Sequence, residues 1–117
     1  YKVPPLYDRS TFTIPDTVTK IEDSAFESST LIERVNVPSS VTTIKDSAFY
    51  TDTNYGLKNI YLNMDDAVIS DSAFKMRNFI GSTQTPRRNV YVKNNNMKSN
   101  LETLYKDYLD KITFRVN

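Results

Sequence analysis

The stretch IEDSAF at residues 21–26 is repeated as IKDSAF at residues 44–49 and as ISDSAF at residues 69–74. Asp23 and Asp46 are 23 residues apart, and Asp46 and Asp71 are 25 residues apart. Self-similarity at a period of about 20–50 residues is typical of solenoids and related repeat architectures. The repetition therefore predicts that one structural unit is built several times in succession.

A short alternation of apolar and other residues precedes each copy. It reads Phe12-Thr13-Ile14-Pro15 before the first copy, Val35-Asn36-Val37-Pro38 before the second and Ile60-Tyr61-Leu62-Asn63 before the third. Such alternation predicts strands, because successive side chains of a strand point to opposite faces. The prolines stand where a strand should end, since proline cannot donate to a ladder. One strand per 23–25 residues leaves room only for a turn, a second short extended piece and a bend, which predicts a β-rich solenoid of parallel strands.

The C-terminal part of the chain changes its period. Asn89-Val90-Tyr91-Val92 has strand character once more, and Ser99-Asn100-Leu101-Glu102 has the pattern of a capping box at the start of a helix. The apolar residues that follow have the spacing of an amphipathic helix. They are Leu101, Leu104, Tyr105, Tyr108, Leu109 and Ile112. Ile112, Phe114 and Val116 then alternate as a last strand, so we expect a capping α-helix and strand in residues 93–117, after repeats over about residues 11–92.

The aspartate and serine of the repeated phrase raise the question of catalysis. Ser24, Ser47 or Ser72 would be the nucleophile, but the chain has no histidine to serve as its base and no cysteine. A chemical step needs one set of groups, whereas a stack of coils needs one set per coil. We therefore interpret the phrase as scaffold and the chain as non-enzymatic. In this interpretation the aspartate accepts hydrogen bonds from backbone N–H groups two and three residues later, the alanine allows close packing and the phenylalanine fills the core.

Composition and charge leave few other classes of site. The formal net charge is +1, which gives no argument for nucleic acid, and no apolar run approaches the roughly 18 residues that a membrane-spanning helix needs. Asp52-Thr53-Asn54-Tyr55-Gly56 has the start of a calcium loop, but position twelve of that loop is Asn63 and not an acidic residue. The pairs Asp65-Asp66 and Arg87-Arg88 are interpreted as solvated. No cofactor or metal site is predicted.

The outward positions of the strands are the candidate binding site. Alternation places eight residues in the core, namely Phe12, Ile14, Val35, Val37, Ile60, Leu62, Val90 and Val92. It then brings Thr13, Asn36, Tyr61 and Tyr91 into one exposed row, flanked by Thr11, Arg34, Asn59 and Asn89. Sheet faces of this kind are where repeat proteins usually bind, and tyrosine is enriched at protein interfaces. The alternative is that Tyr61 and Tyr91 reflect only the strand propensity of tyrosine.

The repeat resembles the BspA-like (bacterial surface protein A-like) leucine-rich repeats. Residues 13–26 and 37–49 match the family pattern almost position by position, and the likeness covers roughly residues 11–92. The chain departs from the pattern in Ser28 and Ser29, in Asn63 and Asp66, and in Arg9 and Arg87, which stand where leucine is expected. The resemblance implies a leucine-rich-repeat solenoid in a secreted or cell-surface protein of host-associated bacteria that adheres to host proteins or to other cells.

From the repeat and this resemblance we expect one domain over residues 1–117, as a piece of a longer protein. The expected function is a protein–protein interaction or adhesion module, whose partner is a host or bacterial surface protein. The alternative is a structural spacer that supports a neighbouring glycan-binding or catalytic domain. The site residues predicted for a partner are Thr13, Arg34, Asn36, Asn59, Tyr61, Asn89 and Tyr91.

Overall fold

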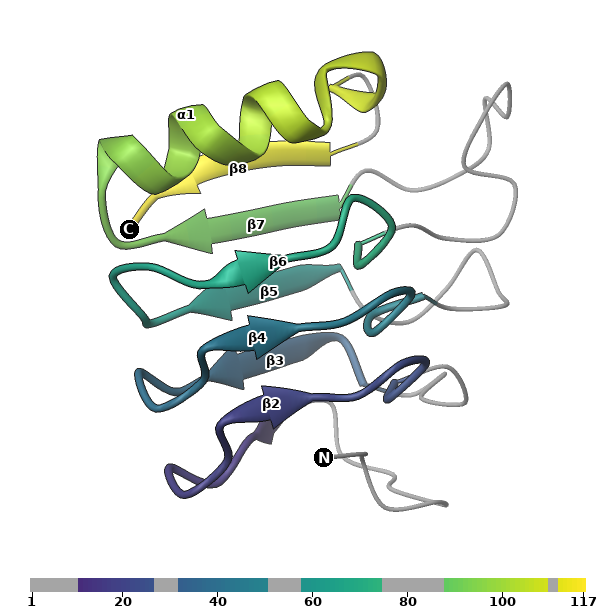
Figure 1. Cartoon of the computed structure of the whole chain (residues 1–117), viewed down its shortest axis with the longest axis vertical. Coiled ribbons are helices and arrows are strands. Elements are labelled where there is room, and N and C mark those ends of the chain that lie inside the picture. The colour runs from purple at the N-terminus through teal and green to yellow at the C-terminus, as the bar shows by residue number, and fades with distance from the viewer. Residues whose placement is uncertain (1–10, 27–31, 51–57, 75–87, 110–111) are drawn as a thin grey trace.

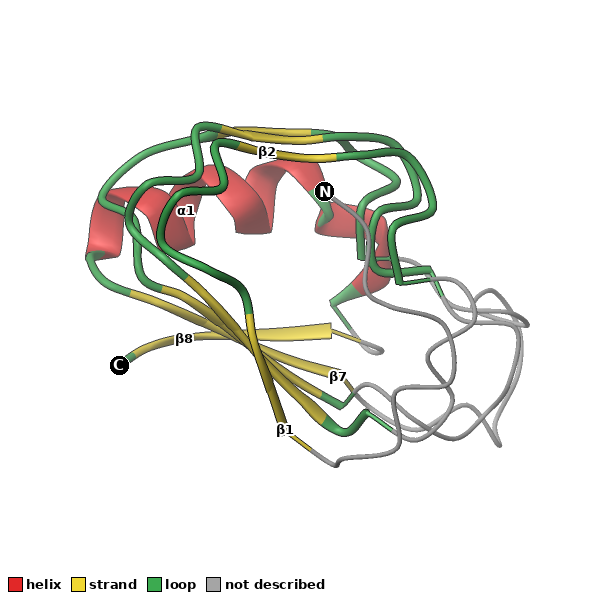
Figure 2. Cartoon of the chain, turned by 90° about the horizontal axis from the view of Figure 1, so that it is seen from below, coloured by secondary structure: helices red, strands yellow, loops and turns green. Residues whose placement is uncertain are grey.

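The strands of the chain form two parallel sheets that enclose one core. The computed structural model describes residues 11–26, 32–50, 58–74, 88–109 and 112–117. The larger sheet has five parallel strands in the order β1 (Thr11–Thr13), β3 (Arg34–Val37), β5 (Asn59–Leu62), β7 (Arg88–Val92) and β8 (Ile112–Val116). The smaller sheet has three, in the order β2 (Lys20–Ile21), β4 (Thr43–Ile44) and β6 (Val68–Ile69). Figures 1 and 2 show them stacked coil upon coil, which confirms the predicted β-rich solenoid of parallel strands.

Each coil contains one long strand, one short strand and one copy of the repeated phrase. The eight strand residues that alternation assigns to the core are all buried. The three phenylalanines of the phrase are completely buried and stack in a column: the ring centroids of Phe26 and Phe49 lie 5.0 Å apart and those of Phe49 and Phe74 lie 5.6 Å apart. The phenylalanine and alanine of the phrase therefore have the packing roles that the sequence predicts.

The bend of the phrase is closed by the backbone and not by the aspartate. The N–H groups of Ala25, Ala48 and Ala73 donate to the carbonyl oxygens three residues earlier, and the N–H groups of Phe26 and Phe49 donate to alanine carbonyls of the next coil at 2.9 and 2.8 Å. Ser24 and Ser47 have φ of 56° and 54°, the left-handed region that such a turn needs at its third residue. The predicted bonds from backbone N–H groups to aspartate are wrong, because these donors have other partners: backbone carbonyls, and in the third copy the Tyr105 hydroxyl for Phe74. Asp46 instead accepts from the hydroxyl of Ser70 in the next coil.

The C-terminal cap contains the expected helix and strand, but the helix begins earlier and ends earlier than predicted. Helix α1 spans Asn95–Leu104, a short 3-10 turn spans Lys106–Tyr108, and β8 follows. The N-cap is Asn94, whose side-chain oxygen accepts from the N–H of Met97 at 2.8 Å. The predicted capping box at Ser99 and Glu102 is wrong: both lie inside the helix, where Glu102 pairs with Lys98 at 3.1 Å. The apolar stripe changes accordingly: Met97, Leu101 and Tyr105 are buried, whereas Leu104 and Leu109 are exposed.

Tyr105 supplies the hydrogen-bond acceptor that an alanine carbonyl of a following coil would otherwise supply. The N–H of Phe74 donates to the Tyr105 hydroxyl at 3.2 Å, where the two preceding phenylalanines donate to an alanine carbonyl. The same hydroxyl donates to the carbonyl of Ser70 at 2.7 Å. Burial raises the pKa of Tyr105 above its ordinary value, so the hydroxyl stays protonated and can act as donor and acceptor together. The side chain thus ends the hydrogen-bond ladder of the repeated phrase.

Candidate binding face on the five-stranded sheet

The outward side chains of the five-stranded sheet form two rows, which we call the strand face. Register aligns Thr13, Asn36, Tyr61, Tyr91 and Arg115 in the first row, and Thr11, Arg34, Asn59, Asn89 and Thr113 in the second. All ten residues are exposed or half-buried. The structure therefore brings together every residue that the sequence assigns to the candidate site.

Arg34 of the second row stacks on Tyr61 of the first row, and Tyr61 stacks on Tyr91. The rings of Tyr61 and Tyr91 lie 4.4 Å apart between centroids and 8° from parallel. The guanidinium carbon of Arg34 lies 3.9 Å from the centroid of the Tyr61 ring, which is the geometry of a cation–π contact. Each ring is therefore held by a neighbour, and both tyrosines are half-buried on the strand face.

Hydrogen bonds link the polar residues of the strand face across the strands. The side-chain amide of Asn36 donates to the hydroxyl of Thr13 at 3.2 Å, and Nε of Arg34 reaches Oδ1 of Asn36 at 3.5 Å. The amide of Asn89 donates to Oδ1 of Asn59 at 3.3 Å. These bonds order side chains that would otherwise be free to rotate, so the strand face is preorganised for binding.

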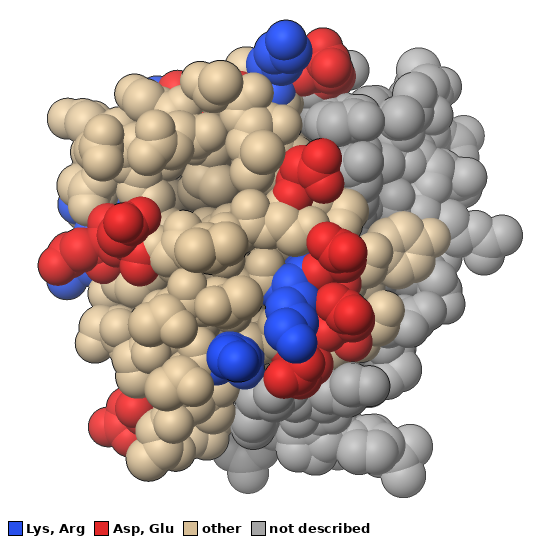
Figure 3. Space-filling view, in the orientation of Figure 1, with Lys and Arg blue, Asp and Glu red and all other residues tan. Residues whose placement is uncertain are grey.

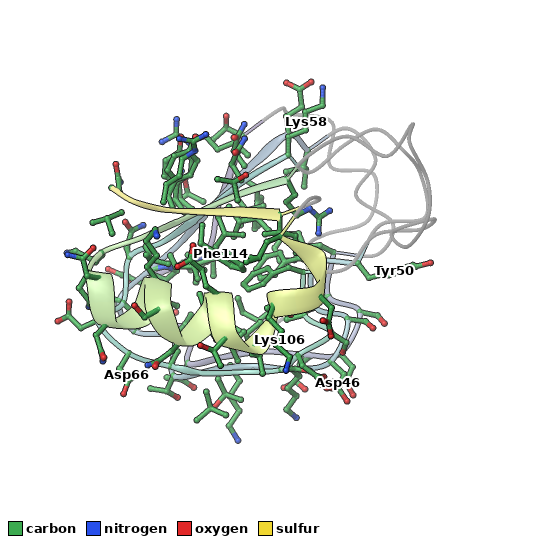
Figure 4. The ribbon with its side chains drawn as sticks, turned by 90° about the horizontal axis from the view of Figure 1, so that it is seen from above. Asp46, Tyr50, Lys58, Asp66, Lys106 and Phe114 are labelled. Carbon is green, nitrogen blue, oxygen red and sulfur yellow. The ribbon has the colours of Figure 1, made fainter. Side chains whose placement is uncertain are left out.

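Arg115 and Thr113 are two members of the strand face that the sequence reasoning missed. They come from β8, whose Phe114 points into the core between α1 and β8 in Figure 4. Phe114 pairs with Val90, and Arg115 pairs with Tyr91. Part of the signal was available, because the alternation of Ile112, Phe114 and Val116 predicts that both residues point outward. The pairing of β8 with β7, which places them in the two rows, comes from the structure.

The strand face carries positive charge and no carboxylate. Its two rows contain two arginines and neither aspartate nor glutamate. The salt bridges within the described part of the chain are Lys45 with Glu22 and Lys98 with Glu102, so Arg34 and Arg115 have no carboxylate partner there. Carboxylates gather instead on the side of the three-stranded sheet, as Figure 3 shows, and Figure 4 shows Asp46 on that side, opposite Lys58.

Arg88 is not solvated, contrary to the prediction for the pair Arg87-Arg88. It is completely buried, and its Nη1 donates to the carbonyls of Phe49 at 2.7 Å and of Phe74 at 2.8 Å. Burial lowers the pKa of Arg88 to about 9, so the guanidinium is still charged at neutral pH. Arg88 therefore ties the second and third coils to β7 and does not extend the strand face. Arg87 lies outside the described residues, as do Arg9, Ser28, Ser29 and the tip 52–56.

The other features of the described residues give no reactive site. Ser72 accepts a hydrogen bond from the N–H of Ser47 and lies 3.1 Å from Ser70, so these hydroxyls link neighbouring coils. No group of three or more acidic residues in the described ranges could hold a metal ion, and no helix in them is long and apolar enough to cross a membrane. A groove of about 200 Å³ lies between α1 and the third coil; it is lined by Asp66, Ala67, Ile69, Met97, Asn100, Leu101 and Leu104.

Comparison with known proteins bears on the whole chain. A family model described as a BspA type Leucine rich repeat region (6 copies) matches residues 8–114. Neither the curated proteins nor the solved structures give a match. Since the matched residues include nearly all of the repeats and the cap, the chain belongs to the BspA-type leucine-rich-repeat family, whose repeats generally serve in protein–protein interaction.

Proposed function

We propose that the chain is a non-enzymatic adhesion module of a secreted or cell-surface bacterial protein, and that it binds a host or bacterial surface protein through the strand face. The observation that carries this proposal is the stack of Arg34, Tyr61 and Tyr91 on an open sheet. Arginine and tyrosine are among the residues that contribute most binding energy at protein interfaces. Membership of a repeat family that is typical of surface and secreted proteins supports the location.

The order of the strand face supports the same proposal. Immobilising a rotamer-rich side chain on binding costs about 0.5–1.5 kcal/mol. Here Arg34 and Asn36 are already held by neighbours, as are Asn59, Asn89 and the tyrosine rings. A partner that docks on this face therefore has less side-chain entropy to remove than it would on an unlinked surface.

A double substitution tests the strand face as the binding site. The chain would be assayed by surface plasmon resonance against a panel of purified host extracellular proteins and bacterial surface proteins, and the best binder would be measured with Tyr61→Ala combined with Tyr91→Ala. We expect binding to weaken by at least about 30-fold, as for hot-spot residues, with the cooperative thermal transition retained.

The matched control removes apolar area elsewhere. Val68→Ala combined with Leu104→Ala acts on side chains of β6 and α1 that are 73% and 42% exposed, and Leu104 lines the groove at α1. This pair should leave the affinity unchanged. If the Val68/Leu104 variant lost binding while the Tyr61/Tyr91 variant bound fully, the binding site would be the groove at α1 and not the strand face. A panel with no binder at all would favour the alternative of a structural spacer.

A further inference from the structure

We propose that the strand face recognises an acidic, extended peptide segment of its protein partner, with two carboxylates that pair with Arg34 and Arg115. The proposal rests on the proposed function, because it names the chemistry of the partner for the same face. The first observation is charge: both rows are free of aspartate and glutamate, although the whole chain has 14 acidic and 15 basic residues.

Arg34 is oriented before any partner arrives. Its guanidinium lies over the Tyr61 ring and its Nε is directed to Asn36, while the terminal nitrogens have no carboxylate partner among the described residues. A guanidinium presents its terminal donors as a planar fork that matches a carboxylate with two parallel hydrogen bonds. Because the stack already fixes the plane of the group, a carboxylate can bind with little further ordering of the arginine.

Arg115 marks the other end of the tyrosine pair. It pairs in register with Tyr91, whereas Arg34 contacts Tyr61, so the two rings lie between the two positive charges. From β3 to β8 there are three strand spacings of roughly 4.8 Å, or about 14 Å in all. An extended peptide covers this distance in about four residues. The matching segment therefore has two acidic residues about four positions apart, with proline or aliphatic residues between them on the tyrosine edges.

The asparagine pair of the second row offers partners for the backbone of such a segment. The bond from Asn89 to Asn59 uses one donor of Asn89 and the side-chain oxygen of Asn59. This leaves the side-chain amide group of Asn59 as a donor and the side-chain oxygen of Asn89 as an acceptor. A peptide N–H and a peptide C=O can bind these two groups whatever the peptide sequence, so the amides add affinity while the arginines select for acid.

Two arginines favour a peptide over a polyanion. Nucleic acids are bound through many phosphate contacts along a basic track, and the strand face has only two cations separated by uncharged residues. The side of the three-stranded sheet carries carboxylates, Asp46 among them, together with lysines such as Lys45, which is paired with Glu22. The strand face, whose two rows hold arginines and no carboxylate, is therefore the surface among the described residues that favours an acidic partner.

Selection from a random peptide library displayed on phage tests this proposal with the folded chain as bait. We expect the enriched peptides to contain aspartate and glutamate above their library frequency, often as pairs about four positions apart. The best peptide would then be synthesised and measured by fluorescence anisotropy at low and high salt. Arg34→Gln combined with Arg115→Gln should weaken binding by about five- to thirty-fold and reduce its salt dependence, and replacing the acids of the peptide with glutamine should have a similar effect.

Matched variants separate the two arginines from net charge. Lys45→Gln combined with Lys106→Gln makes the same charge change away from the strand face and should leave binding nearly unchanged. Lys45 is paired with Glu22, and Lys106 lies on the side opposite Lys58 (Figure 4). Arg34→Lys combined with Arg115→Lys keeps the charge but loses the planar fork and should bind with intermediate affinity. Equal weakening by the arginine and lysine pairs would overturn the proposal.

Other outcomes distinguish this inference from the proposed function. Enriched peptides without acidic residues that still need Tyr61 and Tyr91 would overturn the acidic partner and keep the strand face. Peptides whose affinity is unchanged in both the double tyrosine variant and the double arginine variant would contradict the proposed function itself. The inference would be contradicted if the library enriched no peptide on this chain while a control protein enriched its known peptide ligand in the same experiment. A dimer in sedimentation velocity that dissociates in the double arginine variant would make a second copy of the chain the occupant.

Discussion

Phe49 is the central ring of the aromatic column. It is completely buried, and it stacks on Phe26 on one side and on Phe74 on the other. Ser47, two residues earlier, is half-buried and in the left-handed region, and its N–H donates to Ser72 in the next coil. The two residues of one phrase therefore contribute to stability by different means, the first through packing and the second through backbone geometry.

The contrast between these residues can be measured. We expect Phe49→Ala to lower the free energy of unfolding by about 3–5 kcal/mol, because it removes a ring between two others and leaves a cavity. Ser47→Ala should cost little, since its backbone bond is kept and alanine meets the same left-handed φ as serine. Chemical denaturation monitored by circular dichroism would compare the two. Equal losses would show that the stability of the coil does not depend on the aromatic column.

Arg88 shows what sequence reasoning at the residue scale could not supply. The core phenylalanines were predictable because each copy of the phrase repeats them at the same place. Arg88 stands next to another arginine and occupies a position that Glu33 and Lys58, both exposed, hold in the coils before it. It is buried because the carbonyls of Phe49 and Phe74 need a donor there, and that need exists only once the coils are stacked.

Helix α1 shows the same limit at the scale of an element. Its existence and its buried Leu101 and Tyr105 follow from the apolar period. Its start does not, because Asn94, Asn95 and Asn96 are consecutive and any of them can cap a helix. The choice is made by tertiary structure: the side-chain amide of Asn94 also donates to the carbonyl of Asp65 in the third coil, at 3.0 Å.

Two alanine substitutions test which cap the helix uses. Asn94→Ala should lower the free energy of unfolding by about 0.5–2 kcal/mol, because the N–H of Met97 loses its acceptor. Ser99→Ala should change stability by less than about 0.5 kcal/mol, since Ser99 is an exposed residue inside the helix. Urea unfolding of both variants would decide between them. A larger loss of unfolding free energy for Ser99→Ala than for Asn94→Ala would show that Ser99 caps the helix, as the sequence predicts.

β8 joins the cap to the strand face at the scale of the element. Its inward residues Ile112 and Phe114 were predicted and are buried, and its outward Thr113 and Arg115 extend the two rows to a fifth strand. The seven predicted site residues come from four strands whose spacing is nearly constant. The cap breaks that spacing with a helix, and the register of its strand with β7 could not be read from the repeat.

At the scale of the whole molecule, stability at alkaline pH depends on Tyr105, the residue that closes the stack of coils. The folded chain raises the pKa of Tyr105, whereas an unfolded tyrosine titrates near about pH 10. Above that pH the unfolded state releases a proton that the folded state retains, so the contribution of Tyr105 to the free energy of unfolding falls as pH rises. The lowered pKa of Arg88 acts with the opposite sign.

Comparison of the wild type with Tyr105→Phe isolates this effect, because Arg88 is common to both. At neutral pH we expect the wild type to be more stable by about 1–3 kcal/mol, since the variant leaves the Phe74 N–H and the Ser70 carbonyl without their partner. The difference should shrink as pH rises above about 10. Urea titrations across this range would measure it, and a difference independent of pH would show that the hydroxyl does not hold its proton in the folded chain.

The hydroxyl of Tyr105 also determines how the array can lengthen. Successive coils meet through the same bonds from phenylalanine N–H to alanine carbonyl, so an additional whole unit can stand between two coils without changing either neighbour. The last interface is of another kind, because a side chain replaces the backbone there. Each inserted unit widens the sheet by roughly 4.8 Å and adds one side chain to each outward row. Under the proposed function, the number of units therefore sets the length of the peptide segment that the strand face can contact, while the end closed by Tyr105 stays the same.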